Sequence, residues 1–280
     1  MPAARRKFSE GREPSLETKR TWAGVMPADA PISEWVERFH RDGYVFLEDV
    51  LPLDWVAELK ADLDRELRAN NEEGDGIIQL HHRMFETSPA NLRLFDMEPI
   101  VTFAETLVDR NCHVVHNNSF RSPTGGKGIT TWHQDDAPHY LVTHGEPPTN
   151  VRLPVLLFSC NYYLTDVTEV EHGPFQVVPG SHLFGSHCPP TLEGTKWAEC
   201  AVSCLGHAGS VVMFNNQVWH RGGPNTSDRV RYVTQASYGR RMVTHFYYPF
   251  MNYQMPEHVY RDADPRLKRL LGFLPSGAYG

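Results

Sequence analysis

The feature that most restricts the fold of this chain is a series of strand-like runs after residue 110 with no helical pattern between them. Each run is short, rich in β-branched and aromatic residues, and bounded by Gly, Pro, Asn or Asp, which is typical of a β-strand. The runs cover residues 112–120, 151–164, 174–178, 209–214 and 229–238. Strands that follow one another without crossover helices must pair in antiparallel fashion. The sequence therefore predicts a mostly β fold, with a sandwich or barrel over residues 111–240.

The first third of the chain is predicted to be helical. Residues 32–39 are amphipathic and are followed by Gly43, which suits a helix end, and a second helical pattern of Val and Leu covers residues 52–67. Residues 1–30 are polar, and we expect them to form a mobile arm. No shift in composition divides the remainder, so we expect a single domain over residues 31–280. Its expected parts are a helical layer at 31–110, a β core at 111–240 and a C-terminal extension at 241–280.

The composition excludes several classes of protein. Hydrophobic residues make up 40% of the chain and aromatic residues 11%, which is enough to build a core and excludes general disorder. The formal net charge of −7 disfavours nucleic-acid binding, which requires a basic surface. We expect no membrane span, because no apolar run approaches roughly 20 residues. The five cysteines form no disulfide framework, so we expect a cytoplasmic protein with reduced thiols; its oligomeric state stays open.

Among the fifteen histidines, His133 stands in a pattern that favours metal binding. His133 and Asp135 are two positions apart, so in an extended segment both side chains point to the same side and can bind one ion. A histidine from elsewhere would complete a set of two histidines and one carboxylate. Such a set leaves coordination positions open and suits non-haem Fe(II) and O₂ chemistry. The tripeptide alone is a weak signal, because the same spacing also arises in surface turns.

A second pattern surrounds His220. A cluster of turn residues lies between two apolar runs and predicts a β-hairpin whose four-residue loop is residues 224–227. In that register His220 lies opposite Arg231, and directly opposed residues share a sheet face. A buried guanidinium needs a carboxylate, and no acid of the hairpin occupies that face. We therefore expect Arg231 to bind an acidic ligand beside the metal, with Arg229 as the second choice.

A third segment, residues 171–182, lies between these two patterns. It reads Glu-His-Gly-Pro-Phe-Gln-Val-Val-Pro-Gly-Ser-His, a short strand between a Gly-Pro turn and a Pro-Gly-Ser-His turn. With the histidine motifs on either side, and with the helix–strand pattern at residues 39–45, this order resembles the phytanoyl-CoA dioxygenase family over about residues 32–240. The resemblance implies a double-stranded β-helix core of the jelly-roll or cupin type. His172 departs from the family, which usually carries a small polar residue there; because it lies in a turn, we expect little functional consequence.

The resemblance also implies the site residues, position by position. The implied iron ligands are His133, Asp135 and His220. Arg231 matches the arginine that binds the far carboxylate of 2-oxoglutarate, in agreement with the hairpin argument. Asn161 matches a strand position that contacts the co-substrate in relatives, and Arg121 lies where relatives carry a basic residue near the site.

The function implied by the resemblance is that of an Fe(II)- and 2-oxoglutarate-dependent dioxygenase. With O₂, it would convert 2-oxoglutarate to succinate and CO₂ while hydroxylating a C–H bond of a small-molecule substrate. Within the same enzyme class, desaturation, epoxidation or ring closure are alternatives. A non-oxidative cupin-like metal enzyme and a non-catalytic small-molecule binder are alternatives of other classes. The substrate stays open, as do the roles of residues 139–144 and of the C-terminal extension.

Overall fold

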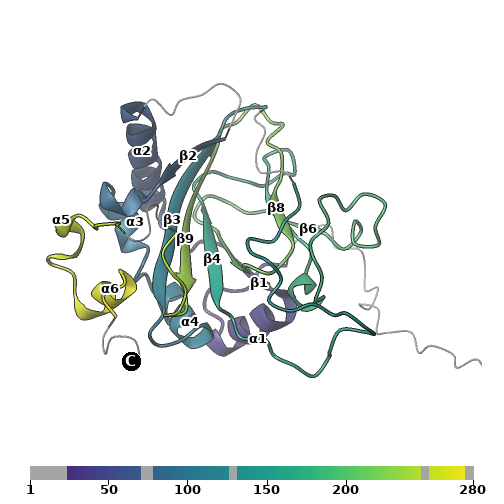
Figure 1. The fold of residues 1–280 in the computed structure, drawn as a ribbon. Helices are drawn as coiled ribbons and strands as arrows, with labels where there is room; N and C mark the ends of the chain where they lie inside the picture. Colours follow the sequence, from purple (N-terminus) through teal and green to yellow (C-terminus); the bar gives the residue numbers. More distant parts are fainter. Residues whose placement is uncertain (1–23, 71–77, 126–130, 247–251, 275–280) are drawn as a thin grey trace, which may run out of the picture.

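The computed structural model describes residues 24–70, 78–125, 131–246 and 252–274, in which two antiparallel sheets lie face to face (Figure 1). The larger sheet has the order β1 (Tyr44–Leu47), β7 (Val211–Asn215), β4 (Leu157–Tyr163), β9 (Arg231–Gly239), β3 (His113–Ser122) and β2 (Gln79–His82). The smaller sheet has the order β6 (Val202–Cys204), β5 (Phe175–Val177) and β8 (His220–Gly222). The predicted jelly-roll class is confirmed. Most of the predicted N-terminal arm at residues 1–30 lies outside the described ranges.

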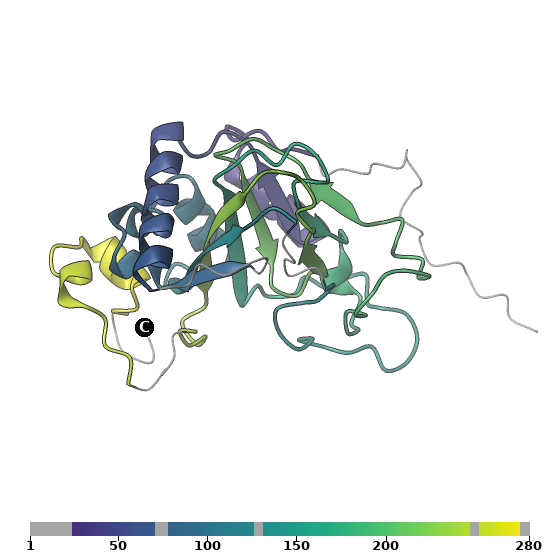
Figure 2. The ribbon, with the colours of Figure 1, turned by 90° about the horizontal axis from the view of Figure 1, so that it is seen from above.

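Helices cover the outer face of the larger sheet, as Figures 1 and 2 show from two directions. They are α1 (Ile32–Asp42), α2 (Leu53–Ala69), α3 (Pro89–Arg93), α4 (Ile100–Leu107), α5 (Glu257–Tyr260) and α6 (Pro265–Leu270), with 3₁₀ turns at Met84–Glu86 and Ser181–Leu183. The first helix ends as predicted, because Gly43 adopts a left-handed conformation with φ of 81°. Side chains of the larger sheet alternate between this helical layer and the smaller sheet. In the described residues, no helix has the length and apolarity needed to span a membrane.

A separate core fills the space between the two sheets. Its buried members are Tyr44, Phe46, Tyr163, Val167, Phe175, Val177, Cys204, Val212, Phe214, Val218 and Val233. The Tyr163 hydroxyl on β4 joins the sheets: it donates to the carbonyl oxygen of Cys204 at 2.9 Å and accepts from the backbone N–H of Phe175 at 3.0 Å. The smaller sheet is therefore held at a fixed position over the larger one.

The predicted hairpin between His220 and Arg231 is wrong. On β8, His220 pairs with Val177 of the smaller sheet, whereas on β9 Arg231 pairs with Ser122 of the larger sheet. The connection between β8 and β9 crosses from one sheet to the other. The side-chain amide of Asn225 stabilises the crossing by donating to the carbonyl oxygen of Ser122 at 3.3 Å. A Gly-Pro-Asn turn cluster is compatible with either a hairpin or a crossing, and the closure of the two sheets over a common core selects the crossing.

A small third core lies under the long loop before β6. It consists of Trp132, Val178, Leu192 and Trp219, with Phe184 and Trp197 packed against it. The Phe184 and Trp197 rings are stacked with centroids 4.2 Å apart, and the Trp197 ring meets Trp219 edge-on at 6.1 Å. Trp132 and Trp219 directly precede the two histidines singled out in the sequence. The long loop therefore packs against the backbone that carries those histidines.

Candidate metal centre

The structure brings His133, Asp135 and His220 together at the free edge of the smaller sheet. His133 forms an isolated antiparallel bridge with His220, so the two rings lie 4.3 Å apart. The Oδ1 atom of Asp135 lies 3.3 Å from Nε2 of His220 and 3.7 Å from Nε2 of His133. One possible ligand atom from each of the three residues lies within 4.8 Å of the others. This geometry allows all three to bind a single ion.

Backbone hydrogen bonds fix these three side chains in place. The N–H of His133 donates to the carbonyl of His220 at 3.0 Å, the reverse bond measures 2.9 Å, and the N–H of Asp135 donates to the carbonyl of Asn216 at 2.9 Å. Each histidine also has its Nδ1 within 2.9 Å of a backbone carbonyl two residues earlier. A carbonyl accepts only from a protonated nitrogen, which leaves the Nε2 lone pair of both rings free for a metal.

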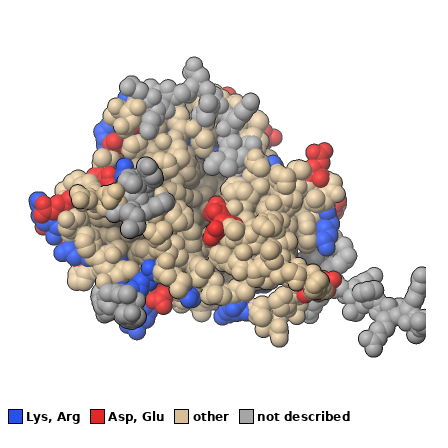
Figure 3. Space-filling view, in the orientation of Figure 1, with Lys and Arg blue, Asp and Glu red and all other residues tan. Residues whose placement is uncertain are grey.

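The surroundings favour the metal-binding protonation states. Burial and the nearby His220 lower the pKa of His133, so its ring is neutral at pH 7. Burial acts to raise the pKa of Asp135, but its closeness to His220 and His133 outweighs burial and lowers that pKa below its ordinary value. The possible donors are therefore the Nε2 atoms of two imidazoles and a carboxylate, which fit a divalent transition metal with positions left open. The face between the sheets is hollowed near its middle, and an acidic side chain borders the hollow (Figure 3).

Arg231 is buried at the inner face of β9, as the sequence predicted, although the route to that prediction was wrong. The residue is only 8% exposed. One Nη2 donates to the hydroxyl of Ser122 at 3.2 Å, while Nε has no hydrogen-bond partner. Within the described ranges no carboxylate forms a salt bridge with it, and burial lowers its pKa. A buried guanidinium with an unused donor is suited to bind an anion from outside the protein.

Comparison with known proteins now decides the family. The phytanoyl-CoA dioxygenase family matches residues 39–233, which include the three clustered residues and Arg231. The chain belongs to the phytanoyl-CoA dioxygenase family. The resemblance inferred from the motifs is therefore confirmed, and with it the expected class of Fe(II)- and 2-oxoglutarate-dependent dioxygenases.

Several relatives of this family member have names or solved structures. An ectoine dioxygenase from Bordetella parapertussis is 25% identical over 231 residues, covering 71% of this chain and 72% of the relative. The α-ketoglutarate-dependent carbocyclase SnoK of nogalamycin biosynthesis has a TM-score of 0.60 and 21% identity, covering 80% of this chain and 89% of that one. HygX from Streptomyces hygroscopicus, solved with nickel and 2-oxoglutarate, has a TM-score of 0.61 and 16% identity, covering 78% and 91%. The two solved structures establish the shared fold.

The other two predicted site residues lie on opposite faces of the larger sheet. Asn161 on β4 shares the inner face with Tyr163, and its side-chain oxygen accepts from Gln235 at 2.8 Å. Arg121 on β3 does not join the site, which corrects the expectation for it. Its neighbour Ser122 faces inward, so alternation turns Arg121 outward, where its Nη1 donates to Gln79 at 2.9 Å.

A row of polar side chains on the inner face of β3 was not predicted from the sequence. A register shift at Val115 places His116 opposite Ser237 of β9, and burial lowers the pKa of His116 to about 4. His116 also interacts electrostatically with Asp135, so it lies toward the metal centre. Further along, the side-chain oxygen of Asn118 accepts a hydrogen bond from Nδ1 of His82 on β2 at 2.7 Å. Counting by twos from Val114 would place His116 on the outer face, and only the bulge reverses this.

Residues 139–144, whose role the sequence left open, pack against their surroundings without reaching the metal centre. The backbone N–H of His139 donates to the side chain of Gln217 at 2.8 Å, and its Nε2 lies 3.8 Å from Asp136. The N–H of Val142 donates to the carbonyl of Gly185 at 2.9 Å, and His144 is exposed. These histidines are not brought to the metal centre.

Gly173 shapes the wall beside Arg231, and its replacement by alanine should destabilise the protein. Its φ is +72°, and an added Cβ would lie 2.8 Å from the carbonyl oxygen of Gly223 and 3.0 Å from Nη1 of Arg231. A matched control is Gly145→Ala, because Gly145 has a φ of +78° with no atom within 4 Å. We expect Gly145→Ala to lower the unfolding free energy by about 1–2 kcal/mol. Gly173→Ala should lower it by about 1–3 kcal/mol more. Equal losses in urea denaturation would contradict a contact at this wall.

Proposed function

We propose that this protein hydroxylates a C–H bond of a small molecule, using Fe(II), O₂ and 2-oxoglutarate and releasing succinate and CO₂. The observation that carries the proposal is the pairing of an open three-residue ligand set with a buried arginine that has no carboxylate partner in the described residues. A metal enzyme without a dicarboxylate co-substrate has no use for such an arginine. This pairing also disfavours the alternative of a non-oxidative cupin-like enzyme.

Each residue has a defined part in this proposal. His133, Asp135 and His220 hold the iron, which together with 2-oxoglutarate supplies the activation of O₂ for C–H oxidation. Arg231 and Ser122 bind the far carboxylate of the co-substrate, and Asn161 contacts it from the inner face of β4. The rings of Phe175 and Phe214, 5.2 Å and 4.7 Å from that of His220, orient this ligand and exclude water behind it.

The same cofactors allow more than one change in the substrate. Hydroxylation is the first candidate, and desaturation, epoxidation and ring closure remain alternatives with the same cofactors. Neighbours named as a carbocyclase and an epimerase share the fold with this chain at 21% and 23% identity. We further propose that residues 31–280 act as one oxygenase domain in the cytoplasm, without nucleic-acid or membrane partners. The five free cysteines and the net charge of −7 support this placement.

Anaerobic titration tests the proposal directly. With Fe(II) bound, added 2-oxoglutarate should produce a weak visible charge-transfer band that neither component produces alone. Admission of O₂ should then remove the band and yield succinate in step with loss of 2-oxoglutarate. Folded protein that binds Fe(II) but gives no band and no succinate would contradict the proposal. A band without succinate would support the non-catalytic binder instead.

A further inference from the structure

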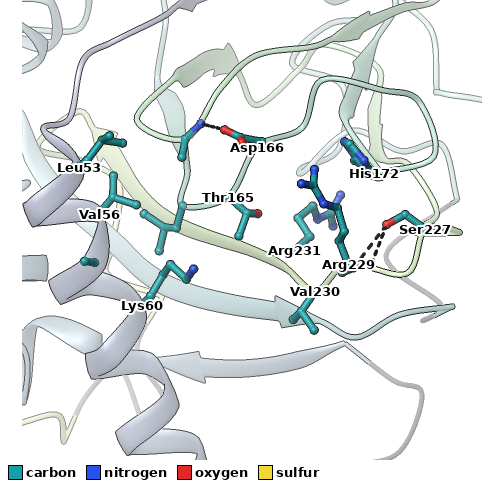
Figure 4. Close-up of a pocket in the computed structure, with 13 residues that line it drawn as sticks. Leu53, Val56, Lys60, Thr165, Asp166, His172, Ser227, Arg229, Val230 and Arg231 are labelled. Atoms are coloured by element: carbon teal, nitrogen blue, oxygen red, sulfur yellow. Dashed lines mark hydrogen bonds between the residues drawn. The ribbon is translucent and has the colours of Figure 1, made fainter.

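A cavity of about 370 Å³ lies behind Arg231, at the end of the sheets next to α2 (Figure 4). Three segments surround it: α2, the stretch that follows β4, and the connection that leads into β9. Its volume is within the range of small-molecule sites, roughly 300–1,000 Å³. The metal ligands do not line it. Arg231 lines the cavity on its inner side and is shared with the proposed co-substrate site.

The charges around the cavity are predominantly positive. Lys60, Arg229 and Arg231 line it, against the single carboxylate of Asp166. That carboxylate is already engaged, because it accepts from the backbone N–H of Ala208 at 3.0 Å and lies 3.4 Å from Nδ1 of His207. In a chain with a net charge of −7, three cations around one cavity form a local site for an anion.

Two of the lining side chains are buried and carry unused polar atoms. His172 is 8% exposed, and among the described residues its Nδ1 has no hydrogen-bond partner; Nε of Arg231, also 8% exposed, is in the same position but belongs to the proposed co-substrate site. Buried polar atoms in native proteins are almost always hydrogen-bonded, so Nδ1 of His172 is available to a polar atom of a ligand in this cavity. Figure 4 shows His172, Arg229 and Arg231 grouped on one side of the cavity.

The opposite side of the cavity is formed by α2, which contributes apolar side chains beside Lys60. Leu53 and Val56 of α2 lie there, away from the two arginines (Figure 4). Leu53 is 70% exposed, so its side chain is accessible to an occupant of the cavity. An occupant that satisfies both sides needs an anionic head and a short aliphatic part.

We propose that this cavity is a second binding site, separate from the metal centre, for a small aliphatic carboxylate. Its head group lies between Arg229, Lys60 and His172, and its chain lies on Leu53 and Val56. An anion bound there reduces the positive potential at Arg231. It therefore weakens the binding of 2-oxoglutarate on the inner side, and the two sites are coupled. This coupling rests on the proposed function, whereas binding in the cavity does not.

Calorimetric titration of the metal-free full-length protein with hexanoate tests the site. We expect binding that the double variant Lys60→Ala/Arg229→Ala weakens at least about tenfold, as the loss of two partly exposed ion pairs predicts. Leu53→Ala should weaken it about threefold, the effect of removing part of an apolar contact. Arg110→Ala removes an exposed arginine elsewhere and serves as the matched control. Asp135→Ala should leave hexanoate binding unchanged, which separates this site from the metal centre.

Two further probes decide the chemistry of the occupant. Inorganic phosphate and 1-hexanol each lack one half of the proposed ligand, so both should bind more weakly than hexanoate. Binding of phosphate as tight as that of hexanoate would overturn the aliphatic part of the proposal. Absence of hexanoate binding, or binding lost in Asp135→Ala but kept in the double variant, would overturn the site itself. In the iron-loaded protein, saturating hexanoate should raise the dissociation constant of 2-oxoglutarate, and the double variant should abolish that shift.

Discussion

Replacement of Asp135 by alanine should reduce the turnover of 2-oxoglutarate more than about a hundredfold, since even changes to residues behind metal ligands cost 10–100-fold. Asp135 supplies the only carboxylate of the three-residue set, and its Oδ1 lies between the Nε2 atoms of both histidines. Without it, only the two imidazoles are left to bind the metal. The two rings also lose the carboxylate that lies close to both of them. Iron binding, measured on the anaerobic protein, should weaken together with succinate formation.

The matched control for this variant is Asp136→Ala. Asp136 carries the same charge one residue later, but its side chain points away from the metal centre and is 64% exposed. We expect it to keep iron binding and turnover within about twofold of the unmodified protein, as is usual for an exposed surface substitution. Full turnover in Asp135→Ala, or an equal loss in both variants, would show that the carboxylate ligand has been misassigned.

Replacement of Arg231 by methionine should raise the dissociation constant of 2-oxoglutarate about thirtyfold or more, which corresponds to losing one partner of a buried charge pair. The same variant should unfold no more easily than the unmodified protein. Its guanidinium is buried and, among the described residues, has the hydroxyl of Ser122 as its one hydrogen-bond partner, so an aliphatic side chain removes an uncompensated charge. Opposite effects on co-substrate affinity and on stability identify an arginine kept for binding.

Two companion variants sharpen this test. Arg231→Lys keeps the charge but loses the planar fork, so it should recover only part of the affinity. Arg229→Ala removes the neighbouring arginine, whose exposed charge is screened by water, so it should weaken 2-oxoglutarate binding far less than Arg231→Met does. If Arg229→Ala weakened the co-substrate and Arg231→Met did not, the carboxylate partner would be Arg229. Isothermal titration with Fe(II)-loaded protein under nitrogen measures all three.

The sequence predicted the fold class and placed His133 and Asp135 on one side of a segment because both inferences depend on local pattern. Strand runs without crossover helices leave an antiparallel sandwich or barrel as the outcome, and the spacing of His133 and Asp135 requires only two residues of extended backbone. The partner of His220 could not be found this way. Its bridge to His133 joins segments almost ninety residues apart, and no local pattern predicts which segment pairs with the strand of His220.

The errors have the same physical origin. The hairpin around residues 224–227 was inferred from turn chemistry, which does not say whether the two flanking strands join one sheet or two. Arg231 nevertheless lies at the inner face, as the resemblance to the family independently implied, because that assignment does not depend on the hairpin. Arg121 was misplaced because its direction depends on the phase of β3, which the bulge at Val115 sets and which no sequence pattern marks. The cavity behind Arg231 is formed by three segments that are distant in the sequence, so it could not be predicted from the sequence either.

The tryptophan-rich core under the loop before β6 links the opening of that loop to the binding of a metal. Trp132 and Trp219 belong to that core and are covalently adjacent to His133 and His220. Any opening of residues 183–201 that displaces Trp219 also displaces the adjacent His220, and a metal bound by both histidines, as proposed, would oppose this opening. Occupancy of the metal centre therefore also sets how often this loop exposes its backbone to proteases.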